Sequence, residues 1–115
     1  MRKMTKGTGV GVFLTTMFLL IVTSAGAEYE QGKNIYENKC ALCHGIKGEG
    51  NGPAATALNP PPSNFKSPGF WEENKDSSIT DTIKKGRGMM PAFDLSPDEI
   101  KDVIDYMSGA FKKER

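Results

Sequence analysis

The clearest pattern of apolar positions lies near the C-terminus and predicts a helix that ends at about Phe111. Ser96 is a typical N-cap residue, Pro97 stands at the first helical position, and Glu99 completes a capping box. One face of this helix is apolar, at Ile100, Val103, Ile104, Met107 and Phe111, with Tyr106 beside them. Because these positions follow the i, i+3, i+4 spacing of one helix face, we expect them, Met107 included, to pack in the core.

A second pattern predicts a helix over residues 30–39. Apolar or small side chains stand at Gly32, Ile35 and Tyr36, again with i, i+3, i+4 spacing, and the pattern leads directly into two cysteines. No stretch of the chain gives a convincing strand pattern. The predicted fold class is therefore all-α.

A third helix is predicted over residues 79–85. Ser77 or Ser78 can cap its first turn, and Gly86 is placed to end it. The connecting segments are rich in glycine and proline, which favours loops, with a possible helical turn over residues 54–58 and a stiff proline connector over residues 59–64.

The first 27 residues have the pattern of a secretory signal peptide. The chain starts with a basic segment, continues with a mostly apolar run over residues 10–22, and then has the small-x-small sequence Ala25-Gly26-Ala27. The apolar run is shorter than the roughly 20 residues of a membrane-spanning helix. We expect cleavage after Ala27 and export to the periplasm; an uncleaved membrane anchor is the alternative.

Cleavage would leave one small domain, residues 28–115. Removing Arg2, Lys3 and Lys6 lowers the basic residues from 15 to 12 against 14 acidic ones, a net charge of −2. This charge does not favour nucleic acid as a partner. A short chain with seven prolines has little apolar surface for a core, so we expect it to fold poorly without a cofactor that acts as a staple.

The chemistry of the chain is concentrated in Cys40-Ala41-Leu42-Cys43-His44, which holds both cysteines and the only histidine. Two thiols one helical turn apart can add to the two vinyl groups of haem, and the histidine that follows can bind its iron. A closed zinc site or an iron–sulfur cluster would need four ligands, and a thioredoxin-like site would need a βαβ context. An exported dithiol or a structural disulfide between the cysteines stays open as the alternative.

A thioether sulfur is a suitable second ligand for haem iron. Residues 28–115 offer Met89, Met90 and Met107. Met107 lies on the predicted core face of the last helix, whereas Met89 and Met90 stand in a glycine-rich loop before Pro91. The distal ligand is therefore expected to be one of these two.

The chain resembles the small class I cytochromes c over residues 30–111. The resemblance rests on the helix that starts at Gly32, the haem motif with the glycine after it, the run 48–53, the segment 86–93 and the last helix. It implies three to four short helices with long loops around one haem c bound covalently through Cys40 and Cys43. His44 and Met90 would be the axial ligands, with Met89 as the alternative to Met90.

The resemblance also implies contacts around the haem. The carbonyl of Pro53 would accept a hydrogen bond from Nδ1–H of His44. Gly32 and Tyr36 would meet Val103 and Tyr106 where the terminal helices cross. Trp71 could donate its indole N–H to a haem propionate or simply pack in the core. The other residues expected to line the pocket are Phe65, Ile83, Met89, Pro91, Phe93 and Leu95.

A haem bound by histidine and methionine has no open iron position, and the only histidine is then committed. We therefore expect an electron carrier rather than an enzyme, a monomer with redox proteins as partners and no small-molecule substrate. The alternatives are a domain that binds carbon monoxide or nitric oxide, and a tightly bound electron-transfer subunit of a dehydrogenase or oxidase. Lys84, Lys85 and Arg87 could dock an acidic partner, or could simply be a solvated helix end.

Overall fold

The structure is a computed structural model that describes residues 3–4, 7 and 24–113. Its elements in chain order are α1 (Ser24–Lys39), α2 (Ala41–His44), the 3₁₀ turn η1 (Ala55–Ala57), α3 (Phe70–Glu73), α4 (Asp76–Lys85) and α5 (Pro97–Phe111). Within the described ranges, β structure is limited to an isolated bridge between Arg87 and Met90. The all-α prediction is confirmed, although no pattern had predicted the single turn α3.

Most of the expected signal peptide lies outside the described residues. Helix α1 starts at Ser24, so the expected cleavage site after Ala27 falls in its exposed first turn. None of the helices in the described part of the chain has both the length and the hydrophobicity that crossing a membrane requires.

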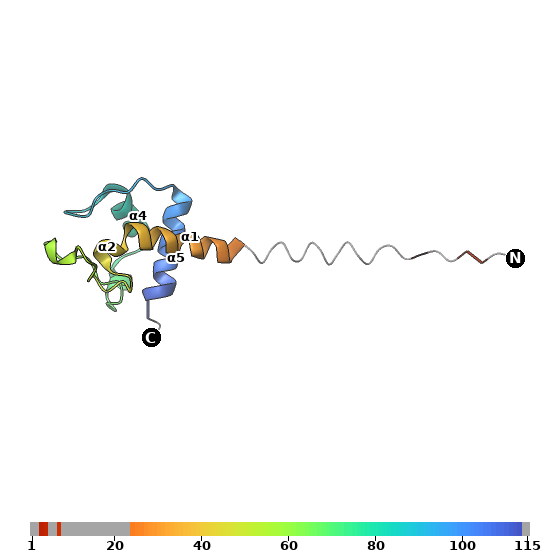
Figure 1. The fold of residues 1–115 in the computed structure, drawn as a ribbon, viewed down its shortest axis with the longest axis horizontal. Coiled ribbons are helices and arrows are strands. Elements are labelled where there is room, and N and C mark those ends of the chain that lie inside the picture. The colour runs from red at the N-terminus through yellow and green to blue at the C-terminus, as the bar shows by residue number, and fades with distance from the viewer. Residues whose placement is uncertain (1–2, 5–6, 8–23, 114–115) are drawn as a thin grey trace.

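The domain is organised by the crossing of α1 and α5, which Figure 1 shows at the centre of the domain. Gly32 of α1 faces the backbone of α5, and a Cβ there would overlap the carbonyl group of Asp102. The close approach buries Tyr36 and Val103 completely, each with 0% of its surface exposed. The predicted helix crossing is confirmed. Glycine is required at position 32 because a side chain there would not leave room for the two backbones.

Helix α5 begins and ends as predicted. Ser96 accepts a hydrogen bond from the Glu99 N–H at 3.2 Å, and the Glu99 carboxylate accepts one from the Ser96 N–H at 2.8 Å. These reciprocal bonds satisfy two donors that the first helical turn would otherwise leave free. Met107 is buried, as its place on the apolar face predicted.

Helix α4 ends at Gly86 as predicted, but the prediction for its start was wrong. Neither serine caps the helix: it begins at Asp76 with Lys75 at the N-cap. The hydroxyl of Ser78 donates to the carbonyl of Lys75 at 2.9 Å, so this side chain bonds back within the first turn. Gly86 takes a φ of 73°, a conformation that glycine adopts without strain.

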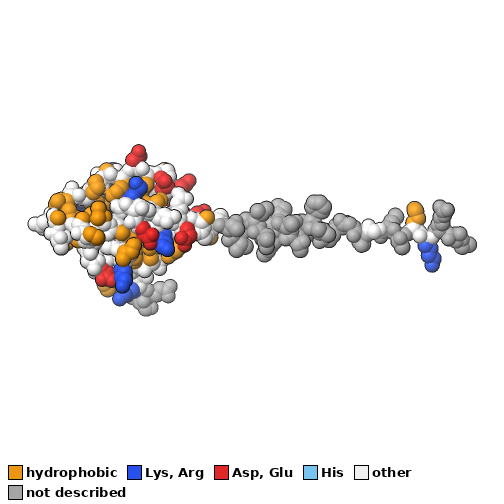
Figure 2. All heavy atoms as spheres, in the orientation of Figure 1, with side chains coloured by type: hydrophobic (Ala, Val, Ile, Leu, Met, Phe, Trp, Pro, Cys, Tyr) orange, Lys and Arg blue, Asp and Glu red, His pale blue; other side chains and the backbone are white. Residues whose placement is uncertain are grey.

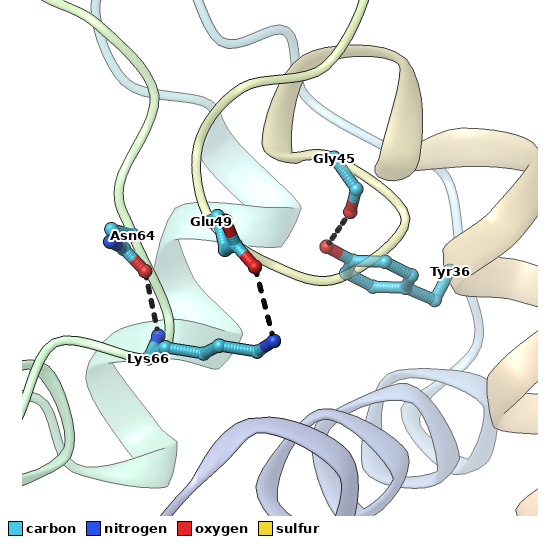
Figure 3. Close-up of polar contacts among 5 residues, drawn as sticks. All are labelled: Tyr36, Gly45, Glu49, Asn64 and Lys66. Carbon is cyan, nitrogen blue, oxygen red and sulfur yellow. Dashed lines mark hydrogen bonds and ion pairs between the residues drawn. The ribbon is translucent and has the colours of Figure 1, made fainter.

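The loop after the haem motif is held by bonds to residues 62–66. The amide of Phe65 donates to the carbonyl of Gly48 at 2.7 Å. Lys66 forms an ion pair with Glu49 at 3.3 Å, and its own amide donates to the side chain of Asn64 (Figure 3). Two segments distant in the sequence therefore form one side of the domain.

Candidate haem site

A cavity of about 660 Å³ lies between the start of the domain, the proline connector and the segment after α4. This volume is in the range of cofactor sites. The sequence-predicted residues that line it are Cys40, Cys43, His44, Phe65, Ile83, Met89, Met90, Pro91 and Phe93. Figure 2 shows hydrophobic side chains concentrated at the end of the domain farthest from the N-terminus.

Cys40, Cys43 and His44 line the cavity from the single turn α2 and the residue before it, which directly follow α1. The amide of Cys40 still donates to the carbonyl of Tyr36 at 2.9 Å, and the amide of His44 donates to the carbonyl of Cys40, also at 2.9 Å. Both cysteines are free thiols and half-buried. The two sulfurs and the imidazole thus share one short, hydrogen-bonded turn.

Burial sets the protonation of these groups. Desolvation raises the pKa of the Cys40 thiol to about 11, which keeps it protonated. Desolvation also lowers the pKa of His44, against a smaller opposite effect from its hydrogen bond to the backbone of Ser63. The neutral imidazole is the form that binds a metal.

The segment 86–93 contributes a loop to the cavity that backbone hydrogen bonds hold together. The amide of Arg87 donates to the carbonyl of Met90, and the amide of Met90 donates to the carbonyl of Arg87, both at 3.0 Å. Further along, the amide of Phe93 donates to the carbonyl of Ile83 at 2.9 Å, which ties the loop to α4. Within this loop Met89 is 56% exposed, whereas Met90 packs against the hydrophobic core.

The hydrogen-bond partner of His44 differs from the expected one. Its Nδ1 lies 3.1 Å from the carbonyl oxygen of Ser63, not from that of Pro53. Pro53 is exposed and lines a separate groove with Leu42 and Ile46. Ser63 was missed because no local pattern shows that a residue 19 positions along the chain reaches the ring.

Trp71 also differs from the expectation. Its indole N–H donates to the carbonyl oxygen of Phe65 at 2.7 Å, so the donor expected for a propionate is already used. Phe65 itself stacks on His44, with ring centroids 4.5 Å apart and planes at 19°. Leu95 does not line the cavity as expected but packs against the hydrophobic core. Trp71 therefore holds Phe65 in place, and Phe65 supports the histidine ring.

The lining fits a haem in charge and polarity. Most side chains around the cavity are apolar, and the charged residues among them are Lys39 and Arg87, with no carboxylate. A flat apolar group that carries two carboxylates matches such a surface. Among the residues that the structure describes, no three His, Cys, Asp or Glu side chains gather as a separate metal site.

Comparison with known proteins also indicates a haem protein. The model of the family described as cytochrome c oxidase, cbb3-type, subunit III matches residues 27–107. Cytochrome c6 of Synechocystis sp. is 32% identical over 89% of this chain and 82% of its own length. Cytochrome c6 of Chlorolobion braunii is 34% identical over 70% of this chain and 89% of its own length.

Two larger proteins match in part. The cbb3-type cytochrome c oxidase subunit CcoP of Azospirillum brasilense is 33% identical over 70% of this chain, which spans 28% of that subunit. A chain of the reducing HAO-like protein complex of Kuenenia stuttgartiensis superimposes with a TM-score of 0.58 and 29% identity. That match covers 70% of this chain and 41% of the other.

The family match covers most of the chain, and the two cytochromes c6 match over most of their own length. Together with the helical fold and the lining of the cavity, these matches determine the family. The chain belongs to the cytochrome c oxidase, cbb3-type, subunit III family and is a small class I cytochrome c, a haem c electron-transfer protein rather than an enzyme.

Proposed function

We propose that this protein is an exported carrier of single electrons that holds one haem c through Cys40, Cys43, His44 and Met90. Haem c, when bound, supplies an iron that alternates between Fe(III) and Fe(II). The observation that carries the proposal is that all four residues line one cavity. The two cysteines would form the thioethers, and the histidine and the methionine would be the axial ligands.

The packing of the loop favours Met90 over Met89 as the distal ligand. Backbone hydrogen bonds on both its N–H and its C=O hold Met90, and its side chain packs against the core. Met89 lines the same cavity but is 56% exposed, so binding the iron would require its side chain to leave solvent. A sulfur held in place needs little movement when the iron changes its charge, which suits electron transfer.

Pocket residues would keep the ligands in position and exclude water. The carbonyl of Ser63 would orient His44 through Nδ1, and Phe65 would support the flat face of its ring. Ile83, Phe93 and Pro91 line the same cavity. An apolar surrounding of this kind limits solvent access and so helps to set the reduction potential.

The leader would be removed during export. Ser24 to Ala27 are exposed at the start of α1, whereas Tyr29 packs edge-on against Tyr106 with ring centroids 5.3 Å apart. Cleavage after Ala27 would therefore keep the contact that anchors the N-terminal helix to α5. The intact mass of the purified protein tests this point, and a mass that includes Met1 would contradict it.

A second candidate function is a tightly bound electron-transfer subunit of an oxidase. It is favoured by the family match and by the partial match to the subunit CcoP. Its expected partners are redox proteins in either case. Co-purification of the haem protein with an oxidase at high salt would favour the subunit, whereas elution as a monomer would favour the free carrier.

The test of the proposed function is the visible spectrum of haem-loaded protein, reduced and oxidised, with and without carbon monoxide. Haem that stays attached on denaturing electrophoresis and a reduced spectrum unchanged by carbon monoxide are expected. A spectrum that shifts with carbon monoxide would indicate a ligand-binding protein instead. Absence of covalent haem would refute the proposal and return the cysteines to a dithiol.

Methionine variants test the ligand assignment. Met90→Ala should abolish the weak sulfur-to-iron band at the red end of the spectrum, and Met89→Ala should leave it. The two variants change neighbouring residues of the same loop, so each is the control for the other. Loss of the band in Met89→Ala alone would contradict the assignment.

A further inference from the structure

The hydroxyl of Tyr36 reaches from α1 to the residue that follows the proposed haem ligand. It donates a hydrogen bond of 2.7 Å to the carbonyl oxygen of Gly45 (Figure 3). Gly45 directly follows His44, and its own amide donates to the carbonyl of Ala41 at 2.9 Å. The N–H of Gly45 is therefore bonded to α2, and its carbonyl oxygen accepts two hydrogen bonds, one from Tyr36 and one of 3.0 Å from the amide of Gly48.

The turn at Gly45 is confined by its surroundings. Its φ of 83° lies in the left-handed region, and a Cβ there would overlap the side-chain oxygen of Asn51. The carbonyl of His44 meanwhile accepts a hydrogen bond from the amide of Gly50 at 2.7 Å. Backbone hydrogen bonds thus hold the chain on both sides of the 44–45 peptide bond, and Tyr36 adds one from its side chain.

Tyr36 is placed to hold this turn firmly. None of its surface is exposed, and its ring packs against Tyr106 and Phe111 of α5 and against Phe65. Burial is the main reason that the pKa of Tyr36 is raised, so the hydroxyl stays protonated and continues to donate. A bond made in such surroundings costs more to lose than one at the surface.

We propose that Tyr36 is a positioning residue for His44, and that its hydrogen bond to Gly45 raises the reduction potential of the haem. This inference rests on the proposed function. Phe65 connects the two residues a second way, because it contacts the ring of Tyr36 and stacks on that of His44. Through these contacts Tyr36, which lies where α1 and α5 cross, helps to orient the imidazole of His44.

The direction of the effect follows from solvent access. Without the hydroxyl, the Gly45 carbonyl keeps only its hydrogen bond from the Gly48 amide, so the turn beside His44 is held less firmly and opens more easily to water. Water near the iron stabilises the more highly charged Fe(III) state, so the potential falls. We expect Tyr36→Phe to change the equilibrium with a redox mediator about threefold toward Fe(III), or roughly 28 mV at 59 mV per tenfold for one electron.

The experiment is a mediator titration of haem-loaded protein at a temperature well below unfolding. Tyr106→Phe is the matched control, since it removes a hydroxyl from the same aromatic cluster at a position that packs on Tyr29 and Tyr36. A lowered potential in Tyr36→Phe alone supports the proposal. An unchanged potential, or equal shifts in both variants, would overturn it and leave Tyr36 a core residue.

A second variant covers the case in which Tyr36→Phe fails to assemble with haem. Replacing Tyr36 by 3-fluorotyrosine keeps the shape of the side chain and makes its hydroxyl a stronger donor. The potential should then rise above that of the wild type, and an unchanged or lower value would overturn the proposal. If the wild-type protein carries no covalent haem, the proposed function fails first, so the two failures are distinguishable.

Discussion

Replacing Gly32 by alanine should weaken the crossing of α1 and α5. A Cβ at this position would overlap the carbonyl group of Asp102 and lie 3.0 Å from the Cβ of Tyr106. Since the overlapped atoms belong to the backbone of α5, no change of rotamer relieves them and the helices must separate. Overpacking costs about 1–3 kcal/mol, and we expect the upper end, about 3 kcal/mol, because backbone has to move.

The helix itself partly offsets this cost. Alanine is favoured over glycine inside a helix by up to about 1 kcal/mol. The expected net loss is therefore about 2 kcal/mol. For a domain of this size, each kcal/mol lowers Tm by about 4–8 °C, so thermal unfolding of the haem-loaded protein should occur roughly 8–16 °C lower.

Gly109→Ala is the matched control for this substitution. Gly109 lies on α5, and a Cβ there would be 3.6 Å from a ring carbon of Tyr29, an ordinary contact. This variant should be as stable as the wild type, or more stable by up to about 1 kcal/mol. If Gly32→Ala unfolded at the temperature of the wild type or above it, the close approach of the helices would not be what requires glycine.

Three further predictions concern the loop, the cap and the core. Gly86→Ala places a Cβ on a residue with a φ of 73° and only 2.6 Å from the Met90 carbonyl oxygen, so it strains the loop that holds Met90. In a urea titration the sulfur-to-iron band should therefore vanish before the helices unfold. Loss of the band and of the helices at the same urea concentration would contradict this. Ser96→Ala removes the acceptor of the Glu99 N–H and should lower the free energy of unfolding by about 1 kcal/mol in urea titrations, and an equal value would count against the cap. Burial raises the pKa of Tyr36 in the folded protein above the value of about 10 in the unfolded chain. The contribution of Tyr36 to stability is therefore complete below that pH. It is lost as the pH rises further, because the tyrosine of the unfolded chain releases its proton first. Unfolding free energy measured from about pH 9 to pH 11 should fall more steeply in the wild type than in Tyr36→Phe, and parallel slopes would refute this.

The start of α5 and the end of α4 could be predicted from neighbouring residues in the sequence. The capping box fixes the start of α5 within four residues, and Gly86 ends α4 through its own backbone freedom. The residues of the haem motif are likewise adjacent in the chain, so their geometry follows from one helical turn. Each of these features depends on residues close in sequence, which a pattern can read directly.

The tertiary structure alone decided the partners of the site residues. The Nδ1 atom of His44 meets Ser63, 19 positions away, and the indole of Trp71 bonds to the backbone of Phe65 rather than facing a propionate. The hydroxyl of Tyr36 reaches Gly45 because α1 and the loop after α2 are folded against each other. The residue types in the sequence indicate which groups are candidates for haem chemistry. Their hydrogen-bond partners depend on long-range packing, because these bonds join segments that are far apart in the sequence and that no local pattern brings together.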